Sequence, residues 1–152
     1  MKLRLPLAGL PLAAGLLLAL PLAANALEYR STARSALLYD APSTAAGKLA
    51  IAGSGLPLEV VVDTDAWVKV RDHSGRLAWI EKSALATTRN LMIKAETSAI
   101  RKQPRADAEV VFSAARGVLL EITGPADNYG WLPVKHAGGL AGWLPAHEAW
   151  GR

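Results

Sequence analysis

Alternating hydrophobic and polar residues define a short segment of the chain at residues 66–80. Two valines in this segment fall on one face of an extended strand. Trp67, Lys69 and Arg71 fall on the opposite face, and a period of two is typical of a strand with one buried side. A polar turn containing a glycine follows, and the second run ends just after Trp79. The pattern predicts a β-hairpin with a tryptophan near each outer end.

A second segment, at residues 130–144, repeats this arrangement with Trp131 and Trp143 in the places of the first two tryptophans. The similarity extends upstream at a constant offset, and the offset increases by two within the loop at 124–130. Matches on both sides of one insertion indicate an internal duplication. The upstream pairs are Pro42 and Pro104, Leu49 and Val111, Gly55 and Gly117, Leu58 and Leu120, and Glu59 and Glu121.

The rest of the pattern predicts short strands and no long amphipathic helix, so the expected class is all-β. We expect strands at 35–42, 49–52, 58–63 and 91–96, a polar lead-in at 28–34, and one helical turn at 81–85. In the strand at 58–63, Leu58, Val60 and Val62 share a face, and the strand at 91–96 is expected at an edge.

We expect these elements to form two small SH3-like β-barrels in tandem, with the first domain at 27–86 and the second at 91–152. The joint at 86–90 is short, so the barrels are expected to pack together.

The amino-terminal segment has the pattern of a secretory signal peptide. Lys2 and Arg4 precede an uncharged stretch at 5–26 that ends in Ala24-Asn25-Ala26, which predicts cleavage after Ala26 and a periplasmic or secreted protein. The alternative is an uncleaved membrane anchor, since the stretch is long enough to cross a bilayer. Three prolines interrupt the stretch and favour cleavage.

The charge and composition of the chain exclude some classes of binding partner. The formal net charge is +4, and Lys2 and Arg4 contribute two of these charges. The remaining balance and the predicted export argue against nucleic acid as a partner. A membrane contact is expected only through the signal segment if it stays uncleaved. The chain has no Cys, so an exported protein of this sequence has no internal disulfide.

In the order and spacing of these motifs the chain resembles the bacterial SH3-like (SH3b) domains of exported and cell-wall proteins. The first copy carries Pro42, Gly55, Trp67-Val-Lys-Val70, Gly75 and Trp79-Ile80, and the second carries Pro104, Gly117, Trp131-Leu-Pro-Val134, Gly139 and Gly142-Trp143-Leu144. Ala78 stands where the family usually has glycine, and Pro133 interrupts a strand. The resemblance implies two small barrels without catalytic activity, whose ligands are cell-wall peptides, glycans or proteins.

The four hairpin tryptophans are the candidate ligand surface, together with two basic residues. Either Trp67, Trp79, Trp131 and Trp143 cover the barrels and fill the interface between the repeats, or one pair forms an exposed platform that stacks on sugar rings. The pair in the first repeat is favoured for the platform because Lys69 and Arg71 flank it and would attract carboxylates. Trp150 and Tyr129 are expected to be packing and loop residues.

Recognition of proline-rich peptides is disfavoured. The run Ala36–Asp40 resembles the start of eukaryotic SH3 domains. However, Ala66 and Gly130 stand at the position that we assign to the groove tryptophan of those domains, and no tyrosine completes the groove.

Catalysis and metal binding are not expected, and neither is a cofactor. There is no thiol, no G-x-S-x-G motif and no H-E-x-x-H motif. His73, His136 and His147 have no metal-ligand spacing. Glu59 and Glu121 recur at equivalent positions, which predicts outward-facing strand residues.

Two functions remain open. One is a binding module for peptidoglycan fragments or envelope proteins, and the other is a structural adaptor in the periplasm with no small ligand. The accessibility of Trp67 and Trp79 to a fluorescence quencher would distinguish them, because exposed indoles favour a recognition surface.

Overall fold

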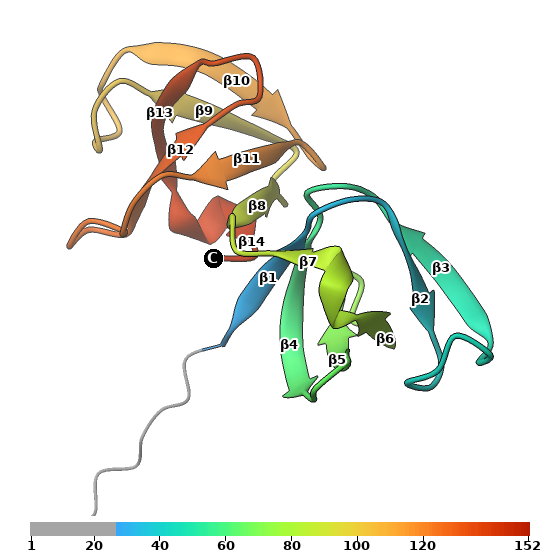
Figure 1. Cartoon of the computed structure of the whole chain (residues 1–152). Coiled ribbons are helices and arrows are strands. Elements are labelled where there is room, and N and C mark those ends of the chain that lie inside the picture. The colour runs from blue at the N-terminus through green and yellow to red at the C-terminus, as the bar shows by residue number, and fades with distance from the viewer. Residues whose placement is uncertain (1–26) are drawn as a thin grey trace, which may run out of the picture.

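Two seven-stranded sheets, one for each repeat, make up the fold in a computed structural model that describes residues 27–152 (Figure 1). The predicted signal segment at 1–26 lies outside the described residues. No helix within residues 27–152 is long and apolar enough to cross a membrane.

The first sheet has the strand order β3-β2-β6-β5-β4-β1-β7, and the second has the order β10-β9-β13-β12-β11-β8-β14. The second order is the first with seven added to each strand number, so the duplication predicted from the sequence is confirmed. A single turn of 3₁₀ helix precedes the last strand of each sheet, at Lys82–Ala84 and Ala146–Glu148. The strands are β1 (Tyr29–Thr32), β2 (Ala36–Tyr39), β3 (Lys48–Ala52), β4 (Pro57–Asp63), β5 (Trp67–Arg71), β6 (Leu77–Glu81), β7 (Leu85–Ala86), β8 (Asn90–Ile93), β9 (Thr97–Arg101), β10 (Val110–Ala115), β11 (Leu119–Ile122), β12 (Trp131–Lys135), β13 (Ala141–Pro145) and β14 (Ala149–Trp150).

Each sheet bends around its own hydrophobic core, but its hydrogen bonding does not close into a barrel. In the first sheet β3 and β7 are the two ends of the ladder, and in the second β10 and β14 are the ends. The predicted hairpin alternation is present: Val68, Val70 and Ile80 are buried, whereas Trp67 and Trp79 on the other face are partly exposed. One apolar face per strand is what drives the sheet to curve around a core.

The prediction of a polar lead-in at 28–34 was wrong, because Tyr29–Thr32 is strand β1 and lies between β4 and β7. Its polar side chains are buried: Ser31 is 1% exposed and Thr32 is 2% exposed. The hydroxyl groups of these residues can be buried because each one has a hydrogen-bond partner. The equivalent strand, β8, lies between β11 and β14 and is not the edge strand that the sequence predicted.

A second departure concerns β4. The sequence placed Val62 on the same face as Leu58, but Leu58 is fully buried and Val62 is 42% exposed. The pairing of β4 with β5 shifts register between Val60 and Val62. Such a bulge moves the residues beyond it to the other face of the strand.

The outer face of β1 packs against the second repeat and forms a seam, which we define by Tyr29, Ser31, Pro57, Asn90 and Trp150. The rings of Tyr29 and Trp150 meet edge to face, with their centroids 5.3 Å apart. The backbone N–H of Asn90 donates a hydrogen bond to the Ser31 hydroxyl at 2.8 Å, and the Asn90 side-chain amide donates to the carbonyl of Gly55 at 3.0 Å. The seam therefore joins the repeats through both aromatic packing and hydrogen bonds.

Gly151, next to Trp150, lies close to Pro57 in the seam. A Cβ atom at Gly151 would lie 2.5 Å from the Cβ of Pro57. Its φ of +92° is also a backbone conformation that residues with a side chain rarely adopt, so glycine is required here for two reasons.

Replacement of Gly151 by alanine should destabilise the protein more than the same change at Gly139. Gly139 has a φ of +93° but nothing within 4 Å of its Cβ position, so it reports the backbone cost alone, about 1–2 kcal/mol. Gly151→Ala should add about 1–3 kcal/mol for the clash with Pro57. Urea unfolding of both variants measures the difference, and equal losses would show that the contact between Gly151 and Pro57 accommodates a methyl group without strain.

Candidate functional site

An aromatic cluster covers the outer face of the first sheet where β2, β5 and β6 lie side by side. Tyr39 pairs with Trp79 across β2 and β6, and Trp79 pairs with Lys69 across β6 and β5. The rings of Tyr39 and Trp67 meet edge to face at 5.4 Å. The ammonium group of Lys69 lies 6.0 Å from the centre of the Trp79 ring. Alternation along β5 and β6 brings these side chains to one face because residues at i and i+2 of a strand point to the same side.

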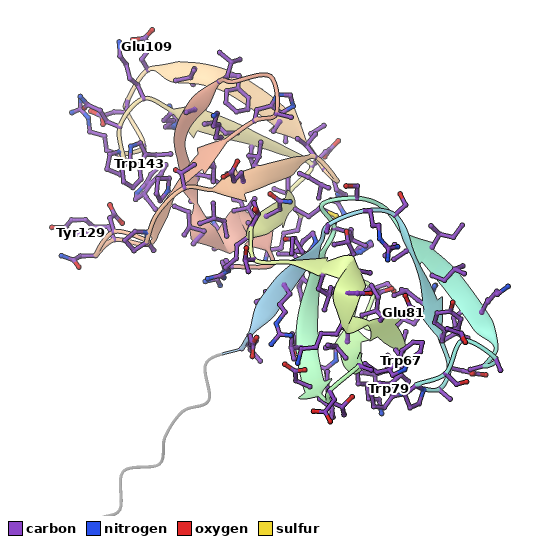
Figure 2. All side chains as sticks on the ribbon, viewed as in Figure 1. Trp67, Trp79, Glu81, Glu109, Tyr129 and Trp143 are labelled. Atoms are coloured by element: carbon purple, nitrogen blue, oxygen red, sulfur yellow. The ribbon has the colours of Figure 1, made fainter. Side chains whose placement is uncertain are left out.

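Trp67 also forms a wall of an open groove with a volume of about 720 Å³. The groove runs between the loop after β2, with Pro42, and the open end of the β5–β6 hairpin, with Asp65 just before β5 and Glu81 at the end of β6. Trp67, Trp79 and Glu81 lie at the end of the first repeat that faces away from the second (Figure 2). This groove is the candidate functional site.

The second repeat has a smaller groove at the equivalent place, with a volume of about 320 Å³. Trp131 lines it as Trp67 lines the first, but Pro145 takes the place of Glu81, and Arg101 stands where the first repeat has Tyr39. The Arg101 guanidinium donates a hydrogen bond to the carbonyl of Ala108 at 2.7 Å. The two grooves share a scaffold but differ in charge and in aromatic content.

Trp143, the remaining hairpin tryptophan, pairs with Pro133 on β12 and with Arg101 on β9. Tyr129 is 88% exposed in the loop before β12, and Trp150 packs in the seam. The four hairpin tryptophans are thus all partly exposed on the outer faces of their sheets, and the seam contains a different tryptophan.

Arg71 has a partner within the protein and does not lie beside the groove. Its guanidinium contacts both carboxylate oxygens of Glu59, at 2.9 and 3.2 Å. Glu59 and Glu121 were predicted to face outward; Glu121 is exposed, whereas Glu59 lies opposite Tyr29 beneath the second repeat and is only 6% exposed. The two glutamates differ in exposure because of the residues opposite them. Tyr29, which packs against the second repeat, lies opposite Glu59, whereas the smaller Asn90 lies opposite Glu121.

The pKa of the Tyr29 phenol reflects the burial of Tyr29 and the charges around it. Burial raises the pKa of Tyr29 above its usual value, and the nearby charge of Glu59 raises it further. The opposing effects of Arg152 and Arg71 are smaller. The charges of Glu59 and Arg71 therefore both act on the Tyr29 phenol at the edge of the seam.

Some of the charged residues around the groove have an ion-pair partner within the protein, and others do not. The Lys82 ammonium group lies 2.7 Å from the Asp63 carboxylate, which also contacts Arg30 at 2.6 Å. These hydrogen bonds, from Lys82 and then from Arg30, hold the pKa of Asp63 below its usual value. Among residues 27–152, Asp65 and Glu81 make no ion pair, so both lining carboxylates are free to meet a ligand.

Sequence reasoning missed Tyr39, Asp65 and Glu81 as members of the site. The hairpin register contains a signal for Glu81, because a β5–β6 pairing centred on the turn at 72–76 places Glu81 opposite Trp67. For Tyr39 no such signal exists, since its pairing with Trp79 joins strands that are far apart in the sequence. Among the described residues, no group of three or more histidine, aspartate or glutamate side chains could hold a metal ion.

Loss of the Arg71 guanidinium should destabilise the fold because it leaves the buried Glu59 carboxylate unpaired. Arg71→Met is expected to lower the free energy of unfolding by about 1–3 kcal/mol. Lys69→Met, on the same strand but without an acidic partner, should change it by less than about 0.5 kcal/mol. Urea denaturation of the two variants tests this, and similar values for both would show that the Glu59–Arg71 pair does not stabilise the fold.

Comparisons with known proteins place the chain in a family. A model of the bacterial SH3 domain matches it twice, at residues 33–86 and 94–151. No curated protein matches. Among solved structures, NlpC1 from Trichomonas vaginalis is similar with 13% identity and a TM-score of 0.37, over 82% of this chain and 45% of that one. NlpC2 from the same organism is similar with 11% identity and a TM-score of 0.38, over 84% of this chain and 49% of that one. The chain thus spans about half the length of these two proteins.

Because the two family matches together cover most of its length, this chain belongs to the bacterial SH3 domain family and carries two tandem copies of the domain.

Proposed function

We propose that this protein is an exported, non-catalytic binding module whose ligand is cell-wall peptidoglycan, and that the ligand occupies the groove beside Trp67. In this proposal residues 1–26 direct export to the periplasm or the exterior, and each bent sheet acts as an SH3-like barrel. The observation that carries the proposal is the open groove of about 720 Å³ with an aromatic wall, on the face of the first repeat that the seam leaves free.

The lining of the groove suits a ligand that has both apolar and polar parts. The partly exposed indole of Trp67 offers a face for a sugar ring or an aliphatic side chain, and Tyr39 supports it from behind. Pro42 on the facing loop adds a second apolar surface, while Asp65 and Glu81 supply hydrogen-bond acceptors. Concave sites with apolar walls and a few polar groups are the usual form of a binding site.

The second candidate function is a structural adaptor that contacts other envelope proteins, and strand β3 favours it. This strand is one end of the first ladder, and it exposes Leu49 (45%) and Ile51 (73%). An exposed apolar edge strand can pair with a strand of another protein. A protein partner would therefore bind along β3 and leave the Trp67 groove unchanged.

Binding to purified peptidoglycan sacculi should depend on Trp67. We expect Trp67→Ala to weaken co-sedimentation about tenfold, which corresponds to the loss of one aromatic contact at the centre of a site. The matched control is Trp131→Ala in the smaller groove, which should bind like the unchanged protein. Thermal unfolding by circular dichroism would show that both variants fold. Equal binding by Trp67→Ala and the unchanged protein would exclude the groove, and an absence of binding would favour the adaptor.

A further inference from the structure

We propose that the Trp67 groove recognises a cationic group, specifically an alkylammonium, and not a carboxylate. This inference rests on the proposed function, because it assigns the chemical class of the ligand to the same groove. It reverses the expectation from the sequence, in which Lys69 and Arg71 beside the tryptophans would attract carboxylates.

The basic residues near the groove are held by other groups. Arg71 is paired with the buried Glu59, and the ammonium group of Lys82 is paired with Asp63 at 2.7 Å and with the carbonyl of Thr64 at 3.2 Å. Lys69 lies over the ring of Trp79 and does not line the groove. Arg34 lines a separate small groove on the other side of Glu81 and makes no ion pair with it among the described residues. Within residues 27–152 the basic residue that lines the groove is Lys82, and because its ammonium group is already paired, an incoming carboxylate would have to compete with Asp63 for it.

The acidic residues of the groove have the opposite property. Asp65 and Glu81 both line it without an ion-pair partner within residues 27–152. Glu81 is directly opposite Trp67 in the β5–β6 pairing, where side chains on one face have Cβ atoms about 5 Å apart. A cation between them contacts the face of an indole and a carboxylate at the same time. Both contacts favour a positive charge.

The second repeat shows that this arrangement is particular to the first. At the equivalent positions Pro145 replaces Glu81 and Tyr129 replaces Asp65, so both carboxylates of the first groove are missing. Glu148 lines the second groove, but its carboxylate lies 3.9 Å from the imidazole of His147, and Arg101 adds a positive charge to the lining. Only the groove of the first repeat therefore combines a tryptophan with two free carboxylates and no free cation.

In peptidoglycan, the group with this chemistry is the side-chain ammonium of the diamino acid in the stem peptides. It stands at the end of a flexible aliphatic chain, which can lie along Trp67 while the ammonium group reaches Glu81. A crosslink converts this amine to a neutral amide. The groove would therefore distinguish uncrosslinked stems from crosslinked ones.

Acetylation of the free amines of sacculi with acetic anhydride removes the positive charge and tests the inference. We expect binding of the unchanged protein to fall about fivefold after acetylation. Glu81→Gln and Asp65→Asn should weaken binding to untreated sacculi by a similar factor and should be insensitive to acetylation. The matched control is Glu96→Gln, a carboxylate exposed on the second repeat, which should behave like the unchanged protein.

A small probe separates this inference from the proposed function. Nα-acetyl-lysine amide should shift the indole N–H resonance of Trp67 in nuclear magnetic resonance spectra, and the same compound acetylated on its ε-amine should not. A shift without binding to sacculi would support ammonium recognition and overturn peptidoglycan as the ligand. Trp67-dependent binding to sacculi that ignores acetylation, with no shift by the probe, would overturn ammonium recognition and leave the proposed function intact.

Discussion

The contact between Tyr29 and Trp150 determines which surfaces of the first repeat remain free. Tyr29 lies on the outer face of β1, and the second repeat covers that face through the aromatic pair and the hydrogen bond from Asn90 to Ser31. Under this cover Glu59 loses most of its exposure and takes Arg71 as its partner. The free part of the outer face is therefore at the other end of β5, where Trp67 begins the strand.

The two copies show how duplication lets one domain change while its fold stays the same. Both keep the strand order and the buried alternation of the hairpin, because these hold the core together. Positions on the outer faces are free of that constraint, and there the copies differ: Tyr39 corresponds to Arg101, and Glu81 corresponds to Pro145. The differences lie in the grooves, where a change of side chain leaves the core intact.

Local patterns in the sequence were sufficient to predict the hairpins, the duplication and the all-β class. They did not reveal β1, because its Ser31 and Thr32 look like loop residues until their hydroxyl groups are seen to bond to the second repeat and to a neighbouring turn. The same limit applies to Glu59, whose burial depends on which repeat covers it. Patterns in one segment describe one strand, whereas these outcomes depend on contacts between segments that are distant in the chain.

Only part of the groove could be predicted from the sequence. The alternation along β5 predicted that Trp67 lies on the outer face, but it did not predict which charged residues around Trp67 are paired. That balance depends on ion pairs such as Lys82 with Asp63, which form because the turn before β5 brings the start of the 3₁₀ turn close to the end of β4. A count of basic residues near a tryptophan therefore does not show which of those charges are already paired within the protein.

The link between the repeats is only three residues long, from Thr87 to Arg89, and the seam holds them on both sides of it. The grooves at Trp67 and Trp131 are thus a fixed distance apart and do not swing independently. Because the seam holds the second repeat rigidly beside the first, its orientation sets the direction from which a polymer can approach the groove at Trp67. The second repeat would then act as a fixed wall beside the binding site, without adding a second site of the same kind.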